Sequence, residues 1–170
     1  YPVSKPLPET FFLREADCWG WATWRRGWAH FNPDGKSLLK QIESRGLEQA
    51  FDIQGCYPYT QMLRNQIEGK NNSWAIRWQA SLFLAGKLTL YPGRSLVQNI
   101  GFDKSGEHCG ATGVFDVEAA QERIIVGGVP VEENKACEGI MAEYFRRIEA
   151  PRVRSLRTRV GQILRKVVGV

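Results

Sequence analysis

Apolar residues recur at helical spacing in three stretches of the first half of the chain. The pattern predicts a helix over 38–51 and a second helix over 58–68, which ends at Gly69. Residues 74–85, WAIRWQASLFLA, are apolar on almost every side, and Arg77 is their only charge. This pattern is typical of a buried helix rather than of an amphipathic surface helix.

The second half of the chain alternates between short apolar runs and polar segments. Strands are predicted over 88–91, 95–100 and 123–131, with a glycine-rich polar loop after the second of them. Asn134 is placed to cap a helix over 135–148. The pattern as a whole therefore predicts a mixed α/β chain in which helices outnumber strands.

Tryptophan is concentrated in residues 18–28, CWGWATWRRGW, which contain four of the six tryptophans of the chain. We expect a helix that is capped by Asp17 and places Trp21, Trp24, Trp28 and Phe31 on one face. Such a stripe is more often core than binding site. Trp19 is predicted to lie on the opposite face beside polar donors, and proteins bind the apolar face and hydroxyls of sugars with this combination. Those donors are Thr23, Arg26 and His30.

Two polar features stand out from their surroundings. Arg77 lies within an apolar helix, where a charge is costly unless an anion pairs with it. Its partner could be an internal salt-bridge residue, a bound ligand or a catalytic carboxylate. His108 lies among the glycines of the loop over 101–113, which can approach a ligand closely, although a surface histidine in a loop is an equal alternative.

The net charge of +5 is distributed unevenly along the chain. Residues 1–145 carry 15 basic and 17 acidic side chains, and residues 146–170 carry eight basic side chains and one acid. A near-neutral body argues against a nucleic-acid-binding domain. Residues 151–170 also carry apolar residues at spacings of three and four, which predicts either a basic helix on an anionic membrane surface or a solvated helix packed on the body.

Cysteine spacing and hydropathy bear on the cellular compartment. Cys18, Cys56, Cys109 and Cys137 are far apart and form no CxxC pair, which argues against a zinc site and favours free thiols. The sequence contains no signal-peptide pattern and no run of about 18 apolar residues. We expect a cytoplasmic protein, held peripherally at the inner membrane face if the basic tail binds there.

Four blocks of sequence together resemble a known family. They are CWGWATWRRGWAHFNPDGK, CYPYTQML, SWAIRWQASLFL and LTLYPGRSLVQNIGFDKSGEHCG, in this order within residues 10–115. This arrangement looks like the C-terminal half of bacterial family 2 glycosyltransferases with the A-type fold, which build surface polysaccharides. The fold implied is an α/β fragment in which helices pack on a small mixed sheet. Residues 1–116 would be its acceptor side, 117–150 a strand and helix extension, and 151–170 a basic amphipathic tail.

The resemblance implies an inverting transfer of a sugar from a nucleoside diphosphate to a glycan or lipid-linked acceptor. Such a reaction needs a carboxylate beside the acceptor hydroxyl. The family has this base just before the tryptophan-containing helix, where this chain has Asn72 and Ser73, neither of which can act as a base. Glu68 is the nearest upstream carboxylate, but it is equally typical of a solvated helix end. The resemblance therefore leaves the base unassigned.

The resemblance also implies a divalent metal, Mn²⁺ or Mg²⁺, held against the diphosphate by an Asp-x-Asp motif. No such motif occurs in this sequence, so the nucleotide-binding half is expected to lie outside it and the chain alone to be inactive. His108 stands at a position where the family has a histidine, and it is expected to reach the metal or the diphosphate in the complete enzyme.

The substrate-binding residues implied by the resemblance come from three of the four blocks. They are Trp19, Gly20, Trp21, Arg26, Trp74, Arg77 and Asn99. The partners expected are a nucleotide sugar and a glycan acceptor, without nucleic acid. The clustered tryptophans and the missing acidic motif favour one alternative, which is a non-enzymatic domain that binds carbohydrate or another partner. A third interpretation makes the basic tail primary, as a binder of nucleic acid or of a membrane surface.

Overall fold

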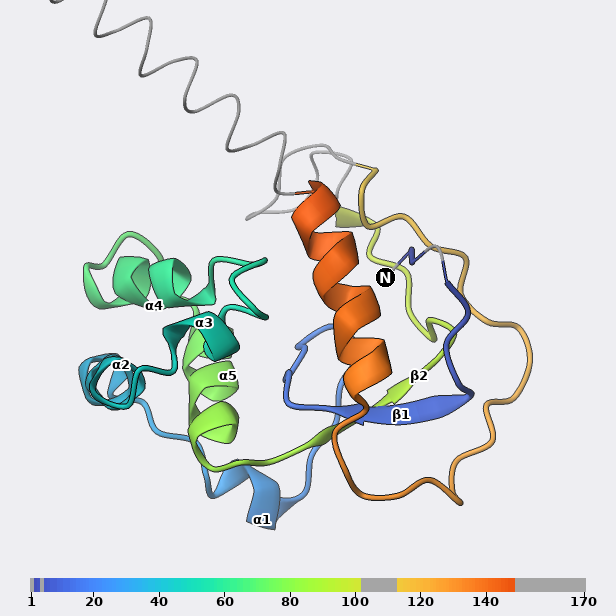
Figure 1. The fold of residues 1–170 in the computed structure, drawn as a ribbon, viewed down its shortest axis with the longest axis horizontal. Coiled ribbons are helices and arrows are strands. Elements are labelled where there is room, and N and C mark those ends of the chain that lie inside the picture. Colours follow the sequence, from blue (N-terminus) through green and yellow to red (C-terminus); the bar gives the residue numbers. More distant parts are fainter. Residues whose placement is uncertain (1, 4, 102–112, 149–170) are drawn as a thin grey trace, which may run out of the picture.

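The computed structural model describes residues 2–3, 5–101 and 113–148. Within these residues the chain is mixed α/β, with six helices and one two-stranded antiparallel sheet (Figure 1). The sixth helix, over 135–148, carries no label in the figure. The labelled elements are β1 (Thr10–Leu13), α1 (Arg25–Trp28), α2 (Gly35–Ser44), α3 (Glu48–Phe51), α4 (Tyr59–Ile67), α5 (Trp74–Leu84) and β2 (Thr89–Pro92).

Helices α2 to α5 pack together as one group, and their start and end points follow from local chemistry. The Ser37 N–H donates to the carboxylate of Asp34, which caps α2. Gly46 then adopts a φ of 63°, and the Leu47 N–H closes the helix end by donating to the Ile42 carbonyl. The prediction of one helix over 38–51 was therefore wrong, because this closure separates α2 from α3.

The other two helices of this group match the sequence prediction. Helix α4 has Glu68 as its C-cap, and Gly69 follows it with a φ of 73°. Helix α5 is buried on most sides, as its apolar composition predicts. The core of the group is formed by Leu38, Ile42, Phe51, Leu63, Ile76, Ala80 and Phe83.

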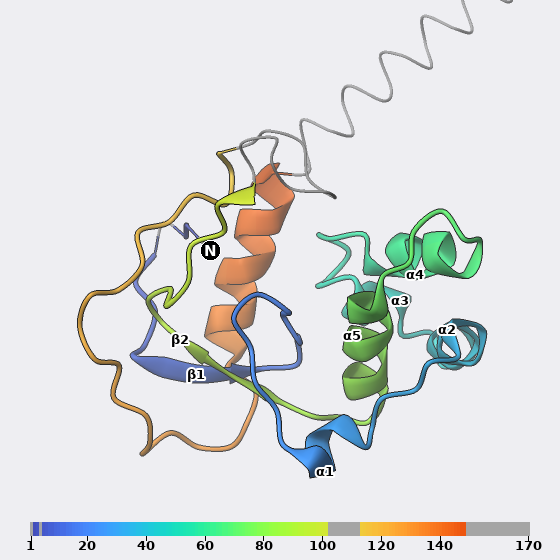
Figure 2. The same cartoon turned by 180° about the vertical axis from the view of Figure 1, so that it is seen from behind.

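A second core lies between the sheet and the helix over 135–148. Strand β1 pairs with β2 in the register Phe11 to Tyr91, and the helix begins beside this pair and runs away from it in both views (Figures 1 and 2). Its start is fixed by Asn134, whose side chain accepts a hydrogen bond from the Cys137 N–H, as predicted. This core is formed by Phe11, Leu13, Ile53, Cys56, Cys137, Met141, Ala142, Tyr144 and Phe145, from both sides of the predicted boundary at 116.

The sheet differs from the one predicted. Strand β1 was not predicted, and the segments over 95–100 and 123–131 form no strand, so two of the three predicted strands were wrong. Only the strand predicted over 88–91 is present, as β2. The chain after 123–131 meets β1 through a single bridge between Phe12 and Glu133. The coarse α/β class is confirmed.

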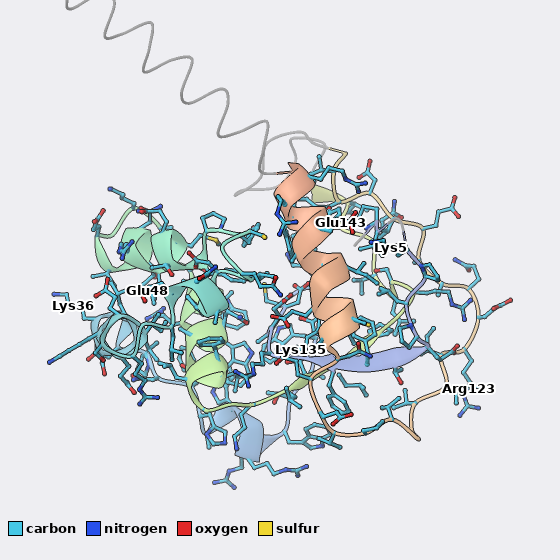
Figure 3. All side chains as sticks on the ribbon, in the orientation of Figure 1. Lys5, Lys36, Glu48, Arg123, Lys135 and Glu143 are labelled. Carbon is cyan, nitrogen blue, oxygen red and sulfur yellow. The ribbon has the colours of Figure 1, made fainter. Side chains whose placement is uncertain are left out.

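Ion pairs tie the helix over 135–148 to its surroundings on the surface. Lys5 and Glu143 lie beside each other near the far end of the helix, with 2.6 Å between Nζ and Oε2 (Figure 3). At the start of the helix the Lys135 ammonium contacts Glu133 at 2.6 Å and Glu138 at 2.9 Å. Exposed pairs of this kind each contribute little to the free energy of unfolding.

Several predictions fall outside this part of the chain. The basic tail over 151–170, most of the loop over 101–113 and with it His108 and Cys109 lie outside the described residues. The three described cysteines, Cys18, Cys56 and Cys137, are free thiols, as expected for them. No helix in the described residues is both long enough and apolar enough to cross a membrane.

Candidate functional site

A hollow of about 460 Å³ lies between the tryptophan segment, the end of β1 and the chain that follows β2. Its volume falls within the usual range of ligand pockets, about 300–1,000 Å³. Apolar side chains form most of its wall, and Asp17 is the only acidic residue of the lining that the structure describes. The other residues that the argument uses are Trp19, Gly20, Trp21, Thr23, Trp24, Tyr91, Ser95 and Asn99.

One buried and one partly buried side chain hold the backbone around Asp17. The Ala16 N–H donates to Gln79 Oε1, and Gln79 is only 4% exposed on α5. The Tyr91 hydroxyl accepts from the Asp17 N–H at 3.0 Å and donates to the Glu15 carbonyl at 3.2 Å. Because each bond joins this segment to a different core element, Asp17 is held in one position relative to both α5 and β2.

The segment after Asp17 is not the predicted helix. Asp17 Oδ1 accepts from the Trp19 N–H at 3.0 Å, which forms a turn instead of a helix cap, and the only helix here is α1. Trp24 precedes α1 in an extended conformation and is 69% exposed. The prediction that Trp24 shares a helical face with Trp21 and Trp28 was therefore wrong.

Gly20 allows a close approach of two parts of the hollow's wall. It has a φ of 62°, and a Cβ built on it would lie 2.3 Å from Cγ1 of Val97. Both the left-handed conformation and the space therefore favour glycine at this position. Nearby, the Trp19 ring meets the edge of Phe115 at a centroid distance of 5.5 Å.

A second hollow, of about 540 Å³, is also lined by the tryptophan segment. It shares residues 21–24 with the first hollow. Its remaining lining residues are Arg25, Trp28 and Trp74. Trp28 and Trp74 are 42% and 40% exposed, so their rings are open to a ligand.

Three of the four tryptophans that line the second hollow, Trp21, Trp28 and Trp74, are also part of an aromatic cluster. Trp21 lies 5.5 Å from Trp74 and 5.7 Å from Trp78 between ring centroids. Trp28 stacks on Phe31 at 4.7 Å. Trp78 is 2% exposed and forms the base of this cluster on α5. The cluster therefore contributes to the core through Trp78, and it is also partly exposed at the surface through Trp28 and Trp74.

Arg26, a predicted sugar-binding residue, covers one exposed ring. Its guanidinium carbon lies 4.9 Å from the centroid of Trp24. Arg25 follows Trp24 and lines the second hollow directly. Neither guanidinium forms an ion pair with a carboxylate in the part of the chain that the structure describes.

Arg77 has a different environment from the one predicted. Its guanidinium donates to the Pro33 carbonyl at 3.2 Å and lies 6.0 Å from the Phe31 ring centroid. Its Nε is buried without a hydrogen-bond partner. Among the described residues it pairs with no carboxylate, and it lines neither hollow.

The residues considered for the catalytic base lie outside both hollows. Glu68 is an exposed helix-end residue whose carboxylate contacts Lys70 at 2.5 Å. Asn72 is exposed in the turn before α5, and the Ser73 hydroxyl caps that helix by accepting from the Ile76 N–H at 3.3 Å. Trp74, two residues after Asn72 in the sequence, does line the second hollow.

A metal site is not formed by the described residues. No group of three or more His, Cys, Asp or Glu side chains among them is arranged to hold a metal ion. The described acids therefore do not fit the implied divalent metal by themselves, and His108 lies outside the described residues. Asn99 does line the first hollow, where its Oδ1 accepts from the Gly101 N–H at 3.0 Å.

Glu15 is a buried acid next to the first hollow. It is 7% exposed, and burial is the main cause that raises its pKa from 4.5 to about 8. The nearby carboxylates of Asp17, Glu138 and Glu133 raise the pKa further. Glu15 is therefore mostly protonated at neutral pH, and it adds no full negative charge beside Asp17.

The sequence analysis did not identify some residues of the site. Asp17 was interpreted as a helix cap and Trp28 as core, although both line a hollow. Tyr91 was seen only as part of a strand, yet it holds the Asp17 backbone. The sequence feature that could have identified Asp17 as a site residue is its position as an acid just before the tryptophan-rich segment.

The structure does bring together five of the predicted substrate-binding residues. Trp19, Gly20, Trp21 and Asn99 line the first hollow, and Trp21 and Trp74 line the second. Comparisons with protein-family models, curated proteins and solved structures find no match to this chain.

Proposed function

We propose that this chain forms the acceptor-binding side of an inverting glycosyltransferase of the bacterial family 2 kind. The observation that carries the proposal is the first hollow, which is lined by the exposed rings of Trp19 and Trp24 and by Asp17. The Asp17 carboxylate accepts a hydrogen bond from the Trp19 N–H. Aromatic rings bind the apolar face of a sugar, and a carboxylate accepts hydrogen bonds from its hydroxyls. The reaction type comes from the sequence resemblance, and the first hollow is where we propose that the acceptor binds.

Asp17 is the residue that we assign as general base. It lines the hollow, whereas Glu68 and Asn72 do not. A sugar hydroxyl that donates to Asp17 would pass its proton to this carboxylate as its oxygen attacks the anomeric carbon of the donor. The bond from that carbon to the nucleoside diphosphate breaks in the same step, and the diphosphate leaves with the electron pair.

The donor is expected to bind to a nucleotide-binding half that this sequence does not contain. A divalent metal at the diphosphate stays a prediction for the complete enzyme, and no step assigned to Asp17 depends on it. The 170 residues alone are accordingly expected to show no turnover of any nucleotide sugar.

The test is a transfer assay with the longest protein that the gene encodes, using labelled nucleotide sugars and glycan acceptors. Asp17→Asn is expected to lower kcat by about 10²- to 10⁴-fold, because loss of a general base has this effect. Asp116→Asn is the matched control, because Asp116 is an exposed carboxylate that lines neither hollow. Equal activity of Asp17→Asn and the control would contradict the assignment of the base.

A non-enzymatic carbohydrate-binding domain is the second candidate, and the exposed indoles of the two hollows favour it equally. The two candidates differ in one result of the same assay. Saturable glycan binding without transfer by the longest protein, with every donor tested, would support the binding domain and overturn the enzyme.

The basic tail over 151–170 is proposed to hold the enzyme at an anionic membrane surface, where lipid-linked acceptors are found. Each basic residue near such a surface contributes about 1 kcal/mol. Flotation with vesicles that contain anionic lipid tests this, and equal recovery with and without the tail would contradict it. Neutral vesicles are the control.

A further inference from the structure

The two hollows adjoin the same short segment of chain. Both are lined by residues 21–24, so ligand groups bound in the two hollows would contact the same four residues. Each hollow also has an exposed ring of its own, Trp19 in the first and Trp74 in the second. These rings are 37% and 40% exposed. Each hollow therefore offers an exposed ring on which one sugar unit can stack.

The two hollows carry opposite charges. The first is lined by the Asp17 carboxylate and by no described basic residue. The second is lined by the exposed Arg25 and by no described acid, and Arg26 lies on the shared Trp24 ring. A guanidinium without a carboxylate partner in an open aromatic hollow suits an oxyanion, either a carboxylate or a phosphate.

From this arrangement we propose that the acceptor is an anionic oligosaccharide of at least two sugar units. The unit in the first hollow carries the reacting hydroxyl beside Asp17. The adjoining unit stacks on Trp74 in the second hollow and presents a carboxylate or phosphate to Arg25. This inference rests on the proposed function and adds the size and charge of its substrate.

The experiment is isothermal titration calorimetry of the full chain with matched sugars. The probes are methyl glycosides of glucose, galactose, mannose and N-acetylglucosamine, and their β1,4-linked disaccharides. Each disaccharide is also tested with one unit oxidised to a uronate and with one unit phosphorylated. Disaccharides are expected to bind about tenfold more tightly than monosaccharides through the second ring, and the charged forms about tenfold more tightly again.

Single-site variants separate the two hollows. Trp74→Ala is expected to reduce disaccharide affinity by about tenfold, to the level of a monosaccharide. Trp74→Phe should restore most of the loss, because it keeps an aromatic face. Arg25→Gln is expected to remove the preference for charged over neutral disaccharides and nothing else. Ile125→Ala is the matched control, because Ile125 is 71% exposed and lines neither hollow.

The outcomes distinguish this inference from the proposed function. If Trp74→Ala leaves the ratio of disaccharide to monosaccharide affinity unchanged, or if charge makes no difference, the anionic oligosaccharide is excluded while the proposed function stands. If no sugar binds at 10 mM, on the order of the weakest specific affinities, or if Trp19→Ala does not weaken monosaccharide binding, the proposed function itself fails. A preference for the uronate or for the phosphate form identifies which oxyanion Arg25 binds.

Discussion

The helical group α2–α5 and the tryptophan segment over 17–31 bury their large apolar side chains to very different degrees. In the helical group Ile42 and Leu63 are 0% exposed and Phe51 is 1% exposed. In the segment Trp24 is 69% exposed and Trp28 is 42% exposed. The first region removes its apolar surface from water, and the second leaves much of it there.

This difference shows what each region contributes. Apolar area that is removed from water stabilises the fold by about 25 cal/mol per Å². Indole rings that stay exposed contribute less to the fold, and a contiguous exposed apolar patch marks a binding surface. The tryptophan segment is accordingly the region where we propose that a ligand binds, and α5 of the helical group packs against it through Trp78.

The largest effect is expected for Phe51→Ala in the helical group. The Phe51 ring lies 5.2 Å from Phe83 and 5.7 Å from Tyr59 between centroids. Its removal leaves a cavity and should lower the free energy of unfolding by about 3–5 kcal/mol. Urea denaturation followed by circular dichroism measures this value. A loss of stability under about 1 kcal/mol would show that this core is loosely packed. It would contradict the contrast between a tightly packed helical group and an exposed tryptophan segment.

Glu15→Gln is expected to have the next largest effect, with the opposite sign. The folded pKa of about 8 lies above the ordinary 4.5, so the folded state holds a proton that the unfolded state loses. Wild-type stability therefore falls as pH rises from 4.5 to 8, by about 1.4 kcal/mol per pH unit for this group. The variant, which does not titrate, should be more stable by about 3 kcal/mol at pH 7 and by under about 1 kcal/mol at pH 5.

Thermal unfolding at several pH values measures the Glu15 effect. Glu118→Gln is the control, because Glu118 is exposed, lines neither hollow and does not belong to the core. A gain of stability that does not depend on pH would show that the carboxyl is not the cause.

Gly20→Ala tests how closely the wall of the first hollow is packed. The variant must adopt a φ of 62° and also displace Val97, and we expect a loss of about 2 kcal/mol. Gly128 has a φ of 71° with no atom within 4 Å of an added Cβ, so Gly128→Ala should lose only about 1 kcal/mol. The difference between the two measures the contact with Val97, and equal losses would mean that Val97 moves freely.

The smallest change in stability is expected for Trp24→Ala. Because this ring is mostly exposed, the free energy of unfolding should change by less than about 0.5 kcal/mol. Trp78→Ala is the matched comparison, since Trp78 is 2% exposed and should cost about 3–5 kcal/mol. Similar losses for the two tryptophans would contradict the difference in burial between the exposed tryptophan segment and the core.

Regular local patterns predicted three of the six helices of the described residues. Helices α4, α5 and the one over 135–148 were expected from apolar spacing, from Gly69 and from Asn134, because helices are stabilised by residues three or four positions apart. The sequence prediction missed the break between α2 and α3, because it placed Gly46 inside one helix over 38–51.

Strand β1 shows why the sheet was harder to predict. Its four residues carry no alternation of apolar and polar positions, and its partner β2 lies about 80 positions later, with Thr10 opposite Pro92. The apolar runs over 95–100 and 123–131 have the composition of strands, but they form no strand pairing with the other described residues. A strand depends on a partner that local sequence does not identify.

The sequence by itself determined the helices that begin and end on local signals, the burial of α5 and the concentration of tryptophan over 18–28. Only the tertiary structure decided how those tryptophans are used. Gln79 and Tyr91, which are distant in sequence, hold the backbone at Asp17 and draw the chain into a turn where a helix was expected. The physical reason is that helical periodicity is set by neighbours within one turn, whereas a hollow forms where segments far apart in the chain pack against each other.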